Sequence, residues 1–376
     1  MMSAILRATT LWSCATLGLC VTAGCTPEVV GPDTGQTQPD DTGETGETGD
    51  SGETGETGDT QDTGETGDTQ DTGTEPQVFD CSAVPELPEP ETIITGAFGS
   101  KGLAFDDEGH IVGTDGTSLI KASYDGDWSV WIPGARQVEG LAYLSDGDLI
   151  STYGYGAGEV RRYTPEGAQT TVVGGLANYS VIIAPNDMIY AAGWNGAFVI
   201  HPDTGEYTEL FTGDQGFPGG VSPRTLAFSK DYDKLFIGTI DNRGRVFVVD
   251  LDEDYLPVDQ PQVFATGLGN GWHDGLGIDI CGNVYAVDYN STALYRATAD
   301  GNEVTKLVDW SDNRRELAHG LIFGSGEDGW RIDAVYLPES ENGNQVKEIV
   351  VGVPGNRWAG EVINQTVFGS TRRVAD

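Results

Sequence analysis

Six side chains that could do chemistry recur at the same place in a sequence repeat, each directly before a small residue and an apolar segment. Successive copies of this position lie 38 to 50 residues apart. The set contains two cations, two carboxylates, an imidazole and a phenol: Lys101, Glu139, Tyr179, Arg224, Asp274 and His319. In the third copy the register also allows Asn178 at this position. We call these six residues the mouth ring, because the fold predicted below places them together.

Two chemistries follow from these residue types. Ca²⁺ takes six or more oxygen ligands, so the candidate metal ligands are Asp274, Glu139 and Asn178. An imidazole beside a carboxylate can act as an acid or base near neutral pH, so the candidate catalytic residues are Asp274, His319 and the adjacent His273. The folded part contains no GxSxG elbow, HExxH pair or phosphate loop that would define a reaction by itself.

Each of these residues also has a structural interpretation. Asp274 could accept hydrogen bonds from backbone amides at a turn. Glu139 could form an ion pair across the ring with Lys101 or Arg224. Either arrangement would engage a carboxylate that a metal ion or a reaction would need.

The repeat predicts the elements that position the mouth ring. Each copy has a short apolar strand, a turn rich in Asp, Asn and Gly, a second apolar strand, a third strand of alternating character and an edge-like fourth strand. Clear copies of the first strand occupy residues 101–105, 139–143, 225–228, 274–278 and 319–323, and a less regular copy occupies 180–183. Four strands in each of six repeats predict an all-β fold, a six-bladed β-propeller. Residues 92–94 could supply an outer strand to the last blade.

Other residues with chemical potential lie outside the ring. Trp194 and Trp272 could line a pocket at the mouth or pack between blades. His110 and His201 fall in predicted turns, where we assign them no role.

The repeated pattern Gly-Leu-Ala-Phe, acidic turn, Gly-x-Ile/Val resembles the calcium-dependent lactonase group of six-bladed propellers, regucalcin and gluconolactonase, and the related NHL-repeat propellers. The resemblance covers the whole folded part. It implies a metal ion held by one Glu, two Asn and one Asp at ring positions. In that family the metal polarises a lactone carbonyl and a carboxylate activates water.

Only part of that ligand set is present here. The segment His273-Asp274-Gly275-Leu276 resembles the family's Pro-Asp-Gly-Leu/Met, which places Asp274 at the metal-binding Asp. Lys101 stands where the family has its Glu, and Arg224 stands where it has an Asn. The remaining Asn falls near Asn178. Two cations in the ring would oppose the binding of a calcium ion, because their charges already neutralise the carboxylates that the ion would neutralise.

The N-terminal residues predict export. Arg7 precedes an apolar stretch, 11–21, that is too short to span a bilayer and is typical of a signal peptide. Thr22-Ala23-Gly24-Cys25 resembles the bacterial lipobox, in which Cys25 would carry lipid, although Thr22 replaces the usual aliphatic residue. We therefore predict a signal peptide over 1–25 and lipid anchoring to the cell envelope, at the outer membrane or cell surface. The alternative is cleavage without lipidation and secretion.

The composition of residues 26–78 predicts a disordered tether, and the repeats predict that residues 79–376 form the propeller. The tether repeats Asp-Thr-Gly and Glu-Thr-Gly, and residues 26–77 hold 15 acidic residues and no Lys or Arg. Such a segment cannot bury enough apolar surface to offset its ordering entropy. The whole chain has a formal net charge of −39, and about −25 remains in the propeller. Nucleic acid and anionic lipid are therefore excluded as partners, since no basic patch exists to contact phosphates.

Two cysteines belong to the propeller, Cys81 and Cys281. In an exported chain such a pair predicts a disulfide, which would join the start of the domain to a distant strand. We expect a monomer whose membrane contact is through lipid on Cys25.

Two hypotheses for function remain open. In the first, the propeller binds a small molecule, a glycan or a protein at the mouth of its channel without turnover. In the second, it is a metal-dependent lactonase or esterase-like hydrolase with a rearranged site.

Overall fold

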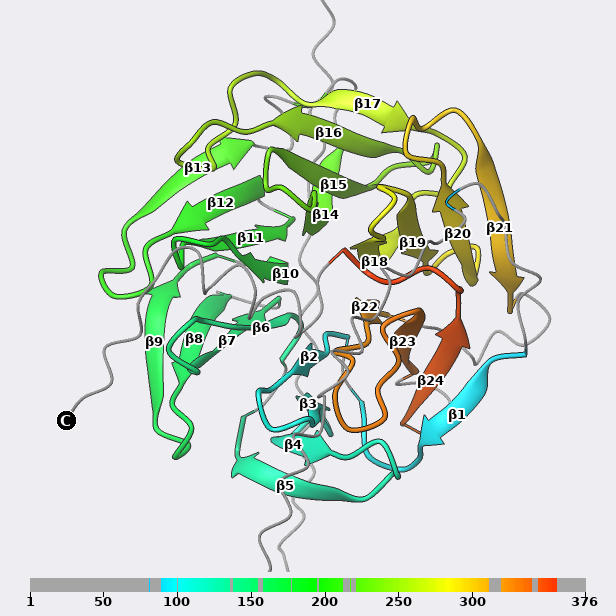
Figure 1. Ribbon diagram of the computed structural model, residues 1–376. Helices are drawn as coiled ribbons and strands as arrows, with labels where there is room; N and C mark the ends of the chain where they lie inside the picture. The colour runs from blue at the N-terminus through cyan, green and yellow to red at the C-terminus, as the bar shows by residue number, and fades with distance from the viewer. Residues whose placement is uncertain are drawn as a thin grey trace, which may run out of the picture. The chain divides into compact units, whose positions relative to one another are not determined.

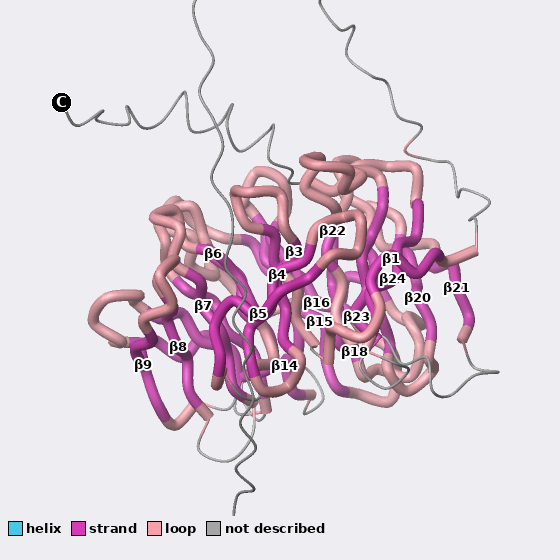
Figure 2. The backbone as a smooth tube through the Cα atoms, turned by 90° about the horizontal axis from the view of Figure 1, so that it is seen from below, coloured by secondary structure: helices cyan, strands magenta, loops and turns pink. Residues whose placement is uncertain are grey.

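The computed structural model describes residues 81, 89–99, 101–135, 138–154, 158–176, 178–194, 196–211, 217, 221–310, 319–339 and 344–356. Within these residues the chain forms 24 β-strands in six four-stranded sheets. The sheets surround a common axis, with the first strand of each repeat innermost (Figure 1), and the loops gather at the two ends of the strands (Figure 2). The predicted six-bladed β-propeller is confirmed. The predicted signal peptide and tether lie outside the described residues, as do 357–376.

The first three blades follow the repeat in chain order, from the innermost strand outward. Blade 1 comprises β2 (Ala104–Phe105), β3 (Ile111–Thr114), β4 (Ser118–Ala122) and β5 (Trp128–Pro133). Blade 2 comprises β6 (Leu141–Tyr143), β7 (Leu149–Tyr153), β8 (Glu159–Tyr163) and β9 (Gln169–Gly174). Blade 3 comprises β10 (Asn178–Ile183), β11 (Ile189–Gly193), β12 (Gly196–Ile200) and β13 (Tyr207–Phe211).

The other three blades have the same order, except that the last blade is completed by the N-terminal strand. Blade 4 comprises β14 (Ser222–Phe228), β15 (Lys234–Ile240), β16 (Val246–Asp250) and β17 (Gln262–Ala265). Blade 5 comprises β18 (His273–Ile278), β19 (Val284–Asp288), β20 (Ala293–Ala297) and β21 (Val304–Asp309). Blade 6 comprises β22 (Ile322–Phe323), β23 (Ala334–Glu339), β24 (Gln345–Val350) and β1 (Glu91–Ile94). No helix in the described ranges has the length and apolar character needed to cross a membrane.

The two ends of the chain close the ring. Strand β1 pairs antiparallel with β24, with Glu91 opposite Glu348, so the outer strand predicted from 92–94 is confirmed. The Cys81–Cys281 disulfide is present, with 5.5 Å between the two Cα atoms. Arg296 also donates a hydrogen bond from Nη2 to the carbonyl oxygen of Cys81 at 2.9 Å. The N-terminal arm is thus attached to blade 5 before it enters blade 6.

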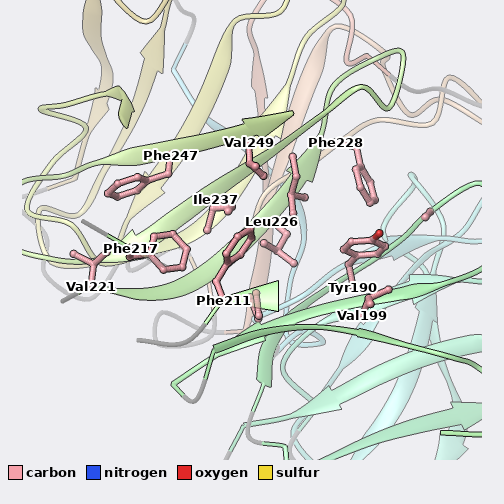
Figure 3. Packing of buried hydrophobic residues seen from close by; sticks show 14 residues of the cluster. Tyr190, Val199, Phe211, Phe217, Val221, Leu226, Phe228, Ile237, Phe247 and Val249 are labelled. Atoms are coloured by element: carbon pink, nitrogen blue, oxygen red, sulfur yellow. The ribbon is translucent and has the colours of Figure 1, made fainter. Parts of the chain in front are cut away.

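The hydrophobic core lies between the blades rather than inside any one of them. The described residues form six apolar clusters, and each cluster is shared by two neighbouring blades. Between blades 3 and 4, for example, Tyr190 and Phe211 meet Phe228 and Phe247 (Figure 3). Burying a side chain of this size stabilises the fold by about 1.5–3 kcal/mol. A blade therefore loses stability on both faces if the ring opens.

We expect the Cys81→Ser/Cys281→Ser double variant to unfold at a lower temperature than the oxidised wild type. The crosslink spans 200 residues, and in the chain-entropy model a loop of that length is worth at most about 5 kcal/mol. Thermal unfolding followed by circular dichroism, with and without dithiothreitol, measures the effect. Reduction should lower the wild-type midpoint and leave the double variant unchanged; equal midpoints for all four samples would contradict the prediction.

Candidate functional site

Backbone irregularities at the start of three innermost strands turn mouth-ring side chains away from the regular sheet pattern. The pairing of β10 with β11 shifts at Tyr179, that of β14 with β15 shifts at Arg224, and that of β18 with β19 shifts at Asp274. Each shift leaves one extra residue on the inner strand, which is a β-bulge. Bulges re-aim a side chain and interrupt the ladder locally. The bulges therefore act on three of the six positions that the sequence repeat singled out.

The small residue after each ring position allows neighbouring innermost strands to pack backbone against backbone. A Cβ atom on Gly320 would lie 2.0 Å from the carbonyl oxygen of Lys101, and one on Gly140 would lie 2.9 Å from the amide nitrogen of Val181. Real side chains do not tolerate such distances. The glycines thus bring consecutive blades close at the axis, and this brings the ring side chains within contact of one another.

Asp274 is held by two partners from the neighbouring blades. Arg224 donates from Nε and Nη2 to Oδ1 of Asp274, both at 2.7 Å. Nδ1 of His319 lies 2.8 Å from the other carboxylate oxygen, Oδ2. The Arg224 and Asp274 side chains are only 3% and 2% exposed. Burial acts to raise the pKa of Asp274, but the hydrogen bond from His319 and the charge of Arg224 outweigh it and hold that pKa below its ordinary value.

Glu139 forms the second ion pair of the ring. Its Oε2 lies 3.2 Å from Nζ of Lys101, and the Glu139 side chain is 5% exposed against 24% for Lys101. Burial raises the pKa of Glu139, although the charges of Lys101 and Arg224 act in the opposite direction. Both ring carboxylates are thus paired with cations, as the structural interpretation of Glu139 anticipated.

Aromatic rings enclose the guanidinium group of Arg224. Its central carbon lies 3.7 Å from the centre of the Tyr179 ring, 5.5 Å from that of Trp272 and 5.9 Å from that of Trp194. Further round, Tyr289 contacts Trp272 with 5.9 Å between ring centres and stacks on His319 at 4.8 Å. We call Tyr179, Trp194, Trp272 and Tyr289 the aromatic wall. Trp194 is 43% exposed, so the wall also presents apolar ring surface to solvent.

Two of the predicted site residues lie deeper in the wall of the channel. His273 is fully buried; its Nε2 lies 2.8 Å from the carbonyl oxygen of Leu268, and the amide of Thr239 donates to its Nδ1 at 3.3 Å. Asn178 is also fully buried and donates from Nδ2 to Leu176, while its Oδ1 has no hydrogen-bond partner. At the third ring position it is Tyr179 that contacts Arg224 and Lys101.

The structure thus brings Asp274 and His319 into direct contact and places His273 between backbone groups. Catalytic roles for Asp274, His319 and His273 stay predictions. Metal binding by Asp274, Glu139 and Asn178 also stays a prediction, and the pairing of both carboxylates with protein cations opposes it.

A cluster of metal-ligand type that the sequence analysis did not single out lies in the first turn of blade 1. One ligand atom from each of Asp106, Glu108 and His110 falls within 4.8 Å of the others. Nζ of Lys121 lies 2.7 Å from Asp106 and 3.2 Å from Glu108, so a cation of the protein already pairs with both carboxylates of the cluster. The alternating spacing of the three residues was the available signal, but it is also ordinary in an acidic turn.

The donor set of the mouth ring does not fit a calcium ion. Ca²⁺ needs six or more oxygen ligands, and both carboxylate oxygens of Asp274 are engaged by Arg224 and His319. An ammonium and a guanidinium group stand beside the two carboxylates and would repel a divalent ion.

The six closed blades and the paired charges at their centre define the class of molecule, a six-bladed β-propeller with a polar, aromatic-walled mouth. No protein-family model matches the chain, and no curated protein matches it in sequence. Solved structures share the fold. A gluconolactonase from Xanthomonas campestris aligns with a TM-score of 0.55 at 16% identity, over 70% of this chain and 89% of that one.

Other propellers align about as well. An auxiliary nutrient binding protein from Bacteroides thetaiotaomicron gives a TM-score of 0.54 at 15% identity, over 67% of this chain and 69% of that one. A luciferin-regenerating enzyme gives 0.52 at 15% identity, over 70% and 94%. Likeness at these identities shows the fold alone. As a likeness of fold, the predicted resemblance to the gluconolactonase and regucalcin group is confirmed.

We expect Asp274→Ala to lower the free energy of unfolding by about 3–5 kcal/mol, because it leaves the buried Arg224 guanidinium without its anion. Replacing both partners, in Arg224→Met/Asp274→Ala, should cost less than the sum of Arg224→Met and Asp274→Ala measured singly, because no unpaired buried charge remains. Urea unfolding of the three variants measures the coupling. Losses that simply add would show that the two side chains do not stabilise each other.

Stability should also depend on the protonation of His273. Burial lowers the pKa of this imidazole from its ordinary value of 6.5, so the unfolded chain takes up a proton before the folded one does. The stability that the neutral, buried imidazole contributes is fully present above pH 6.5 and is lost as the pH falls below that value. Urea unfolding between pH 8 and pH 5 should show this loss in wild type and in the control His201→Gln, and a flatter profile in His273→Gln. Parallel profiles for all three proteins would refute the predicted role of His273 protonation.

Proposed function

We propose that this protein is an exported binding protein that holds a small ligand at the mouth of its propeller channel, without chemical turnover. The observation that carries the proposal is the state of Asp274, whose two carboxylate oxygens are taken by Arg224 and His319. A hydrolase built on this ring would need the Asp274 carboxylate to hold a metal ion or to activate water. In a binding protein the same contacts serve to fix the shape of the mouth.

The aromatic wall supports binding over turnover. Tyr179, Trp272 and Tyr289 are packed in place, and Trp194 presents ring surface at the rim. Ligand sites combine such apolar surface with a few fixed polar groups. Here Arg224, Glu139 and Lys101 are the fixed polar groups, and the ring carries nearly balanced charge inside a strongly acidic molecule. A ligand without large net charge suits this surface best.

The exported location proposed for the chain agrees with its disulfide and with the nutrient-binding function named for one propeller of the same fold. Disulfides persist in oxidising compartments outside the cytosol. Attachment through lipid on Cys25 belongs to the same proposal, and palmitate labelling of the full chain with a Cys25→Ala comparison tests it.

Ligand binding is tested by thermal-shift measurements on the full chain in EDTA, with D-glucose, maltose and diglycine as the first probes. Any compound that raises the midpoint is then titrated by tryptophan fluorescence against two matched variants. Trp194→Ala removes an exposed ring from the mouth, and Trp128→Ala removes one of similar exposure, 45%, from the outer strand of blade 1. We expect at least about a tenfold loss of affinity in Trp194→Ala and none in Trp128→Ala.

Equal losses in the two tryptophan variants would place the ligand elsewhere. The hydrolase alternative is tested in parallel with glucono-1,5-lactone. Metal-dependent hydrolysis that disappears in Asp274→Ala would overturn the proposal in favour of that alternative.

A further inference from the structure

Two carboxylates share the mouth ring, and a protein must neutralise such a pair. Glu139 and Asp274 are close enough for the charge of Asp274 to act on the pKa of Glu139. Both side chains are almost completely buried, at 5% and 2% exposure. Buried like charges destabilise each other unless a cation stands between them. In many proteins a divalent ion with oxygen ligands provides that cation.

Here two cationic side chains of the protein, Lys101 and Arg224, neutralise the two carboxylates. Arg224 is bonded to Asp274 and Lys101 to Glu139, and the charge of each cation also reaches the carboxylate of the other pair. Each therefore acts on both anions, as a shared metal ion would.

The guanidinium group is also fixed in position. Tyr179 lies on it at 3.7 Å, and Trp194 and Trp272 border it at 5.9 and 5.5 Å. With 3% of the Arg224 side chain exposed, a soluble cation would have to displace a group that is held by an anion and three aromatic rings. Cation–π contacts strengthen the hold on a desolvated guanidinium in such a position.

We infer that Lys101 and Arg224 take the place of a divalent metal ion in this propeller, so that the mouth excludes calcium and works without it. The exclusion is a property of these two side chains and not of the remaining donors. Glu139 and Asp274 remain as oxygen donors of a latent site once the two cations are removed.

The inference concerns the same mouth as the proposed ligand binding but is independent of its outcome. The experiment below measures calcium directly, so a failure to find an organic ligand leaves the inference untouched. Conversely, calcium binding by the wild type would overturn the inference without deciding whether an organic ligand binds.

The test is calcium titration calorimetry on the chelator-treated full chain. In Lys101→Gln/Arg224→Asn we expect one calcium ion to bind at least about 100-fold more tightly than in wild type, because two opposing charges are gone. The matched control is Lys306→Gln/Arg245→Asn, which removes the same charge from an exposed pair with Asp309 and a buried pair with Asp241. Adding Asp274→Asn to the first double variant should abolish the gain.

Thermal unfolding with and without calcium chloride covers the case in which the double variant folds poorly. A latent site predicts that calcium raises its unfolding midpoint and does not raise that of the control. A double variant that stays unfolded at every calcium concentration would count against the inference, as would a folded one that binds calcium no better than the control. Stoichiometric calcium binding by wild type that is lost in Asp274→Asn would overturn it outright.

Discussion

Each blade of this protein is a small sheet with apolar side chains on both faces, and neither face is buried unless the six sheets close into a ring. The six core clusters all lie between neighbouring blades, so the hydrophobic stabilisation of any blade depends on its two neighbours. Closure is achieved where β1 joins β24 and where Gly320 allows β22 to approach the backbone of Lys101. The disulfide from Cys81 to Cys281 then ties the closing strand to a third blade.

Closure has an electrostatic consequence at the axis. The mouth-ring residues come from six different blades, and closure forces them into one small, largely buried space. Charged groups can be buried there only if each finds a partner. The pairs Arg224–Asp274 and Lys101–Glu139 meet this requirement, and His319 supplies the second partner of Asp274. The chemistry of the mouth is therefore limited by what is needed to keep the ring closed.

A fold that gathers side chains at one mouth can carry an ion, a substrate or a tethered counter-charge, since sites and not folds determine function. In this chain Lys101 and Arg224 stand at two positions where the resemblance implies metal ligands. The aromatic wall borders Arg224, and Trp194 presents exposed ring surface at the rim, where we propose that an organic ligand binds.

The sequence alone determined the fold class, the order of the blades, the closing strand, the pairing of Cys81 with Cys281 and five of the six ring residues; at the third position it left Tyr179 and Asn178 open, and the structure places Tyr179 against Arg224 and Lys101. These follow from local patterns: strand alternation, turn residues and one repeated position, which hold whatever the neighbouring blades contain. It did not determine which ring residues touch. The bond from Arg224 to Asp274, the burial of His273 between backbone groups, and the cluster of Asp106, Glu108 and His110 with Lys121 depend on side chains far apart in the chain or on rotamers within a turn. Only the closed tertiary structure fixes such contacts, because bulges and backbone packing at the axis set the direction of each side chain, and burial then selects its partner.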